Sequence, residues 1–133
     1  MAFEGQQPVK RIGAVSGADL SAASVQYKFV KYNGTGQQVI LCSGVNDVPC
    51  GVLQAPAPTS AVGQPVEVVA VGQTKLQDGG TLTAGCVVAT TASGQGQPAV
   101  SGQIAAGSCD VIGGAANAYA VVTVNLSAPS IKA

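Results

Sequence analysis

Residues 27–42 read YKFVKYNGTGQQVILC and carry the clearest local indication of structure in the chain. Its first part, residues 27–32, is dense in β-forming side chains and contains partial alternation. Residues 33–36 (NGTG) tolerate the positive φ angles that tight turns require. Residues 39–42 (VILC) return as a second β-rich run. Together these residues predict a β-hairpin.

Strand signals continue on the C-terminal side of this hairpin. Residues 51–54 (GVLQ) predict a short strand, and 55–59 (APAPT) predict an extended segment, because prolines cannot donate ladder hydrogen bonds. Residues 65–71 (PVEVVAV) predict a strong strand in which Val66 and Val68 share one face and Glu67 points the other way. Gly72 interrupts this strand, residues 73–76 continue it, and 78–80 (DGG) form a tight turn.

The last third of the chain repeats the pattern of short strands and turns. Residues 86–90, 99–105 and 118–126 predict strands, separated by glycine-rich turns at 93–98 and 113–117. No segment shows a convincing helical period. Short strands at intervals of about ten residues, divided by Gly and Pro turns, are typical of β-sandwiches and β-barrels. We therefore expect an all-β chain, a small antiparallel β-sandwich or β-barrel-like domain.

The two ends of the chain look different from this β domain. Residues 1–24 are rich in Gly, Ala, Ser and Gln, and their glycines and Pro8 discourage regular structure. We expect residues 1–24 to be an extended N-terminal arm, with a single helical turn over 18–23, and residues 25–127 to be the β domain. Residues 128–133 are expected to be a C-terminal tail.

Charge and hydropathy limit the partners. Charged residues make up 9% of the chain, and the formal net charge is zero. A nucleic-acid partner usually requires a basic stripe, whereas this chain has only Lys10–Arg11 and the pair Lys28 and Lys31, which we interpret as solvated surface. No run of about 18 apolar residues predicts a membrane span, and residues 1–7 lack the pattern of a signal peptide. We expect neither nucleic acid nor membrane as a partner, and synthesis in a cytoplasm.

Four cysteines occur, at Cys42, Cys50, Cys86 and Cys109. Without a secretion signal, reduced and buried thiols are the expected state. A structural zinc site is the alternative, but it favours closely spaced cysteine pairs, which this chain lacks. A disulfide between Cys42 and Cys50 is a second alternative in an oxidising medium, because these residues flank a predicted turn. We expect no metal and no cofactor.

The residues available for catalysis are few. The chain has no histidine, so none can activate its serines, threonines or thiols. A Ser–Lys pair would need Lys28, Lys31 or Lys75 buried beside a serine, and each has an exposed sequence context. The acidic residues stand one at a time: Glu4, Asp19, Asp47, Glu67, Asp78 and Asp110.

Glycine pairs and aromatic residues also fail to predict a ligand site. Residues 34–36, 79–80 and 113–114 lack the pattern of a phosphate-binding loop, so we interpret them as turns. In the alternating strand predicted over 65–71, the Glu67 side chain is expected to point outward, toward solvent or a neighbouring subunit. With no tryptophan and three tyrosines, a sugar-stacking surface is also disfavoured. No catalytic residue is therefore predicted, and we expect that the protein is not an enzyme.

Four ordered segments carry a family resemblance. They are DLSAASVQYKFVKYNGTGQQVILCS (19–43), DVPCGVLQAP (47–56), GQPVEVVAVGQTKL (63–76) and GGTLTAGCVV (79–88). In this order they resemble the small bacteriophage capsid decoration, or cement, proteins, over residues 19–126. Cys86 departs from the family pattern, in which a polar residue, commonly aspartate, follows the Ala-Gly turn; we interpret it as a buried thiol.

This resemblance implies a compact β domain of the β-tulip type that docks on the outer face of a tailed-phage capsid. It implies the major capsid protein as partner, trimers at threefold or quasi-threefold positions, and a virion location. We expect binding after shell expansion, with the N-terminal arm contributing. The alternatives are another virion or surface β module, such as a tail- or fibre-associated module that recognises a host, and an enzyme using a carboxylate pair.

Overall fold

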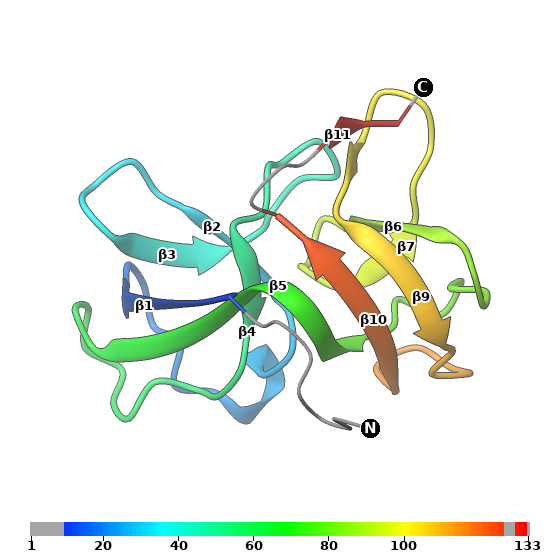
Figure 1. Ribbon diagram of the computed structural model, residues 1–133. Helices are drawn as coiled ribbons and strands as arrows, with labels where there is room; N and C mark the ends of the chain where they lie inside the picture. The colour runs from blue at the N-terminus through cyan, green and yellow to red at the C-terminus, as the bar shows by residue number, and fades with distance from the viewer. Residues whose placement is uncertain (1–9, 127–129, 133) are drawn as a thin grey trace, which may run out of the picture.

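The computed structural model describes residues 10–126 and 130–132, and strands dominate this part of the chain (Figure 1). The strands are β1 (Lys10–Ser16), β2 (Phe29–Tyr32), β3 (Gln38–Leu41), β4 (Gly51–Leu53), β5 (Pro65–Gln77), β6 (Val87–Thr90), β7 (Gly96–Pro98), β8 (Ile104–Ala105), β9 (Gly107–Val111), β10 (Tyr119–Asn125) and β11 (Ser130–Ile131). The 3-10 turn η1 (Ala23–Val25) is the helical element of this part. The all-β, barrel-like expectation is confirmed.

The first half of the chain closes into a five-stranded barrel. Its strands follow the order β1-β3-β2-β4-β5, and β5 pairs again with β1. The predicted hairpin is confirmed, since Val30 pairs with Leu41 and Tyr32 with Val39. Closure matters because it leaves these strands without free edges along the closed part of the ladder.

Strand β5 belongs to two structures at once. Its first half pairs with β1, and its second half pairs with β10. Val71 is the junction, because it faces Lys10 of β1 and Asn125 of β10. Gly72, which follows it, has a φ of 126°, a conformation that side chains rarely adopt. The second half of β5 continues into a sheet of order β5-β10-β9-β6-β7, seen on the right of Figure 1.

Two hydrophobic clusters correspond to these two parts. One fills the barrel and is built of aliphatic side chains: Ala14, Leu20, Val25, Val30, Val39, Leu53, Ala57, Val66 and Val68. The other lies against the second sheet: Phe29, Cys42, Val52, Val69, Leu76, Leu82, Val88, Ala106, Cys109, Ala120, Val122, Val124 and Leu126. Neighbouring residues of β2, β4 and β5 enter different clusters, so part of the barrel wall is buried on both faces.

The prediction of an arm over residues 1–24 is wrong for residues 10–24. Strand β1 pairs with both β3 and β5, and Leu20 is 2% exposed inside the barrel. The glycines do not loosen this segment: a Cβ on Gly17 would lie 2.6 Å from Asn33 Nδ2, so Gly17 permits close packing. The helical turn lies at Ala23–Val25 rather than over 18–23. Residues 1–9 lie outside the described part.

The C-terminal third also differs in detail from the prediction. Of the strand predicted over 99–105, only β8 (Ile104–Ala105) forms, after a turn at Gly102 (φ 90°). The turn predicted over 93–98 is wrong for residues 96–98, which form β7. Strand β9 was not predicted, because Gly107, Ser108 and Asp110 weaken its pattern. Within the expected tail of 128–133, Ser130 and Ile131 form β11 and pair with β8, so this part is a strand.

Candidate functional site

The carboxylates are held by separate partners. Their contacts include Asp19 Oδ1 to Ser21 Oγ (2.6 Å), Asp47 Oδ2 to Lys31 Nζ (2.8 Å), Glu67 Oε1 to Arg11 Nη1 (2.5 Å), Asp78 Oδ1 to Gly80 N (2.7 Å) and Asp110 Oδ2 to Thr123 Oγ1 (2.6 Å). Glu4 lies outside the described residues. Each described carboxylate therefore orders a turn, an ion pair or a strand surface.

The pKa values of two of these carboxylates, Asp47 and Asp19, are lowered. The hydrogen bond from Lys31 is the largest cause of a lowered pKa at Asp47, and the Ser21 hydroxyl lowers the pKa of Asp19. Lys31 and Lys28 are half-buried, so the expectation of exposed contexts is wrong for both, while Lys75 is exposed. Lys31 also donates to Ser43 Oγ at 3.4 Å, but its ammonium is held by Asp47.

All four cysteines are free thiols, and Cys42 and Cys109 are buried. Burial is the main cause that raises the pKa of Cys42 to about 12 and of Cys50 to about 11. The structure does not bring Cys42 and Cys50 onto adjacent strands, as the alternative of a disulfide between them would require, because β2 lies between β3 and β4 in the sheet. Among the described residues, no group of three His, Cys, Asp or Glu side chains is placed to bind a metal.

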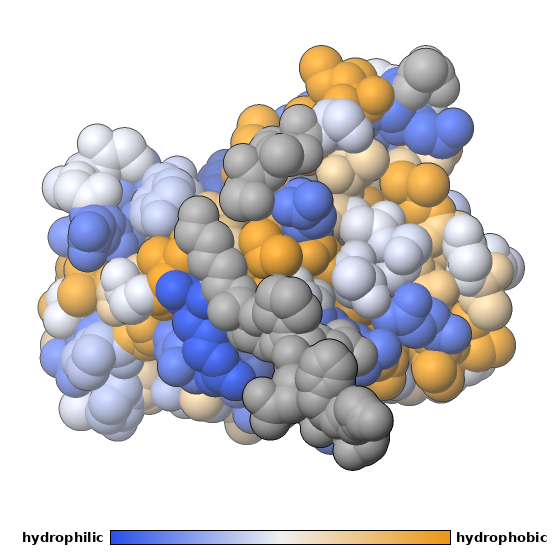
Figure 2. All heavy atoms as spheres, viewed as in Figure 1, coloured by the Kyte–Doolittle hydropathy of each residue, from blue (hydrophilic) through white to orange (hydrophobic). Residues whose placement is uncertain are grey.

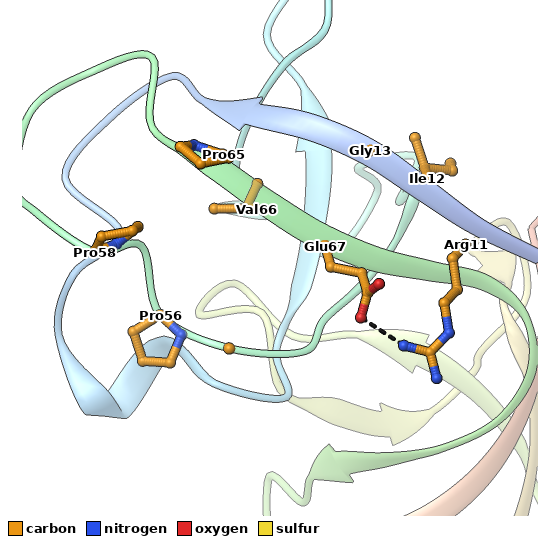
Figure 3. A pocket seen from close by; sticks show the side chains of 9 residues that line it. Arg11, Ile12, Gly13, Pro56, Pro58, Pro65, Val66 and Glu67 are labelled. Atoms are coloured by element: carbon orange, nitrogen blue, oxygen red, sulfur yellow. Dashed lines mark hydrogen bonds and ion pairs between the residues drawn. The ribbon is translucent and has the colours of Figure 1, made fainter.

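A hollow of about 430 Å³ lies beside β1, the start of β5 and the 55–58 segment (Figure 3). We call it the barrel groove, and it is lined by Arg11, Ile12, Gly13, Ala55, Pro56, Pro58, Pro65, Val66 and Glu67. Strands β1 and β5 supply its floor, and the extended proline segment predicted at 55–59 supplies one wall. In Figure 3, Arg11 and Glu67 point toward each other at one end, and the prolines lie at the other.

The charges of the barrel groove neutralise each other. The Arg11 and Glu67 side chains are 55% and 53% exposed, so their ion pair contributes little stability. The prediction that Glu67 points outward from β5 is confirmed, since its neighbours Val66 and Val68 are buried. A single carboxylate paired with a guanidinium is not the two-carboxylate arrangement of general acid–base catalysis. The groove is thus lined mainly by apolar side chains, with one ion pair at its end.

A second feature lies on the outer face of the second sheet. Val111 of β9 pairs with Val121 of β10, and paired residues share a face. Tyr119, two residues before Val121, lies on that face, and Ile112 follows β9 directly. Val111, Ile112 and Tyr119 are 57%, 48% and 46% exposed, and Val121 is half-buried. We call Val111, Tyr119 and Val121 the β9–β10 patch, and exposed Ile112 lies next to it in sequence.

The molecular surface agrees with this placement. Figure 2 shows hydrophobic side chains gathered at the lower right, where β9 ends in Figure 1, with polar side chains beside them. The polar neighbours include Asp110, which accepts from Gln73 Nε2 at 3.1 Å and from Thr123. These bonds tie β5, β9 and β10 together, so the patch rests on an ordered sheet rather than on loops.

Tyr27 reaches the edge of this patch through an unusual backbone. Its φ is 62°, which is rare and strained for a bulky residue. Two hydrogen bonds hold it there, from Tyr27 N to Leu53 O (2.7 Å) and from Gln77 N to Tyr27 O (2.8 Å). The Tyr27 and Tyr119 rings pack edge to face, with their centres 5.2 Å apart. Lys75 Nζ lies 5.8 Å from the centre of the Tyr27 ring. The strain therefore positions an aromatic pair beside a cation.

No protein-family model matches this chain, and no curated protein matches it. No helix among the described residues combines the length and hydropathy needed to cross a membrane.

Sequence reasoning missed the barrel groove, the β9–β10 patch and the left-handed Tyr27. The groove unites residues about fifty positions apart, such as Arg11 and Glu67, so no local motif signals it. The patch had a partial signal, because alternation placed Tyr119 and Val121 on one face of their strand. Its other half, in β9, had no recognisable strand pattern. The glycine turns were interpreted correctly, and Gly34, Gly80 and Gly114 have φ values of 89°, 103° and 90°.

Proposed function

We propose that this chain is a non-enzymatic capsid decoration protein. It binds the outer surface of a tailed-phage shell and stabilises joints between major capsid subunits. The observation that carries the proposal is the β9–β10 patch, an exposed apolar surface on a hydrogen-bonded sheet. Contiguous apolar surface on a soluble domain commonly marks a protein contact. The order of sequence segments that resembles cement proteins supplies the identity of the partner.

The composition supports a role in protein contact. Only 9% of the residues are charged, so docking requires little desolvation of ionised groups. The described carboxylates are occupied in separate local contacts, which does not favour the rival enzyme with two carboxylates in one cleft. A trimer at a threefold or quasi-threefold axis would present three patches, and simultaneous weak contacts multiply the apparent affinity.

The copy number in purified particles is the first test. A decoration role predicts the chain in purified virions at hundreds of copies per particle, made in the host cytoplasm and added to the shell after expansion. Quantitative mass spectrometry against the major capsid protein measures this ratio. A dozen copies or fewer would favour the alternative, a tail- or fibre-associated module. Absence from particles would overturn both.

Two matched substitutions test the patch itself. Val111 in the patch and Val62 in the 54–64 connection are both 57% exposed, so V111D and V62D add the same charge at equal exposure. We expect V111D to lower the occupancy of expanded shells at least tenfold, while V62D stays near wild type, each variant first being shown to melt like wild type. Equal occupancy of both variants would rule out the patch as the docking surface.

A further inference from the structure

Two cysteines far apart in the sequence face each other across the second sheet. Strand β6 pairs with β9 through Val87 with Ser108 and Val88 with Gly107. Just before β6, Gly85 N donates to Cys109 O (2.8 Å), so Gly85 and Cys86 together lie opposite Cys109, as in a β-bulge. Cys109 N donates to Cys86 O at 2.9 Å, which confirms that the two backbones are adjacent at this point. Cys86 also packs against the core cluster that contains Cys109, so the two side chains lie on the same face.

This placement matches the geometry of a disulfide. Facing residues of antiparallel strands have Cα atoms roughly 4.5–5.5 Å apart, inside the range of roughly 4.4–6.8 Å that a disulfide spans. Cys42 and Cys50 provide the contrast within the same chain. Strand β2 separates them, which puts their strands about 9–10 Å apart and out of bridging range.

The position of Cys86 lets the pair react without opening the sheet. Cys86 is half-buried and precedes β6, whereas Cys109 is 2% exposed. The turn before Cys86 is held by Cys86 N to Thr83 O (3.1 Å) and by Gly85 N to Cys109 O (2.8 Å). Burial, then the neighbouring Cys86, raises the pKa of Cys109. Cys86 is therefore the thiol that an external oxidant reaches first.

We propose that Cys86 and Cys109 form a reversible disulfide that locks β6 to β9, with a low-molecular-weight disulfide such as oxidised glutathione as the oxidant. The Cys86 thiolate attacks one sulfur of the oxidant, so a mixed disulfide forms and one small thiolate leaves. The Cys109 thiolate then attacks the Cys86 sulfur and releases the second small thiolate. The two protein thiols lose two protons and two electrons, and the oxidant becomes two thiols. The weak contact from Cys109 Sγ to Val111 O (3.6 Å) is given up.

The bridge would close the segment that contains β6, β7 and β8 onto β9. Cross-linking of this kind restricts the unfolded chain and raises the melting temperature. The inference does not depend on the proposed function, since it concerns the chain alone. The free thiols described above represent the reduced form.

Trypsin separates the two cysteine pairs, which makes the test direct. Cleavage after Lys31, Lys75 and Lys132 leaves Cys42 and Cys50 in fragment 32–75, and Cys86 and Cys109 in fragment 76–132. The reduced full chain is incubated with oxidised glutathione at pH 8, quenched with iodoacetamide in guanidinium and digested without reductant. We expect fragment 76–132 unlabelled and about 2 Da lighter than its dithiol form, and fragment 32–75 carrying two labels.

The opposite results would overturn the proposal. These are two labels on fragment 76–132, glutathione retained on it, or a bridge within fragment 32–75 instead. As a second measurement, oxidation should raise the melting temperature of the wild-type chain by about 5 °C or more, and should leave that of C86S unchanged. A lower melting temperature after oxidation would show that the native register does not accept the bridge.

Discussion

Phe29 and Val30 are adjacent on β2, are both 0% exposed, and lie in different core clusters. Val30 packs inside the barrel, and Phe29 packs against the second sheet. The same division separates Val68 from Val69 on β5. The barrel wall is therefore shared by both cores, and we expect the two halves of the molecule to unfold together.

Truncation of either side chain tests this coupling. We expect F29A to lower the free energy of unfolding by about 3–5 kcal/mol and V30A by roughly 2 kcal/mol, because each leaves a cavity in a closed core. Urea unfolding followed by circular dichroism should show one transition for both variants. V62A, at an exposed position, should remain within about 0.5 kcal/mol of wild type. A second transition in either core variant would show that the halves unfold independently.

Close backbone approach at Gly107 predicts a strong effect of one methyl group. A Cβ at Gly107 would overlap Thr123 O and lie 2.8 Å from Val124 Cα, and neither backbone atom can move without disturbing the β9–β10 pairing. G107A should cost at least about 2 kcal/mol in thermal or urea unfolding. G13A is the control, because its Cβ would meet nothing within 4 Å, and it should be neutral or slightly stabilising. Similar losses for both variants would contradict this account.

The position of β1 changes the expected result of N-terminal deletion. Removing residues 2–9 leaves β1 intact, so the barrel should fold with a melting temperature close to that of the full chain. Removing residues 2–16 takes β1 away and exposes edges of β3 and β5, so this variant should aggregate or fail to fold. Thermal melts and light scattering distinguish the two. A folded, monodisperse chain after deletion of 2–16 would show that the barrel does not need β1.

The shorter deletion also tests, for residues 2–9, the expectation that the N-terminal segment contributes to shell binding. If these residues help to hold the shell, their removal should lower the occupancy of expanded shells while the melting curve stays the same. Cryo-electron microscopy of shells incubated with each protein measures occupancy. Unchanged occupancy would show that residues 2–9 do not contribute to shell binding.

The ion pair of Asp47 with Lys31 predicts acid sensitivity. The pKa of Asp47 is lowered in the folded state, chiefly by the hydrogen bond from Lys31, relative to an ordinary value of about 3.9. Its stabilising effect is complete above the unfolded-state pKa and is lost as the pH falls through the folded-state pKa. The stability difference between wild type and D47N should therefore be larger at pH 6 than near pH 2.5. A difference that does not change with pH in urea titrations would contradict this assignment.

Local signals predicted the parts of the fold that local chemistry controls. The hairpin of β2 and β3 followed from β-forming residues around an Asn-Gly turn, and the alternation in β5 and β10 identified their faces. The N-terminal strand was missed because Gly13, Ala14 and Ser16 carry little β signal of their own. β1 forms because two partner strands are available to it, and that depends on the whole barrel. Strand β9 was missed for the same reason.

By itself, the sequence determined that the chain is all-β, where its main turns lie and which side of β5 carries Glu67, because backbone preference and alternation act over a few residues. It also determined the low charge and the absence of histidine. The tertiary structure decided everything that joins distant segments: barrel closure by β1, the two cores on either side of β2, the Arg11–Glu67 groove and the β9–β10 patch. It also decided which cysteines meet. The turn between Cys42 and Cys50 pointed to that pair, but insertion of β2 between their strands separates them, and strand pairing brings Cys86 to Cys109.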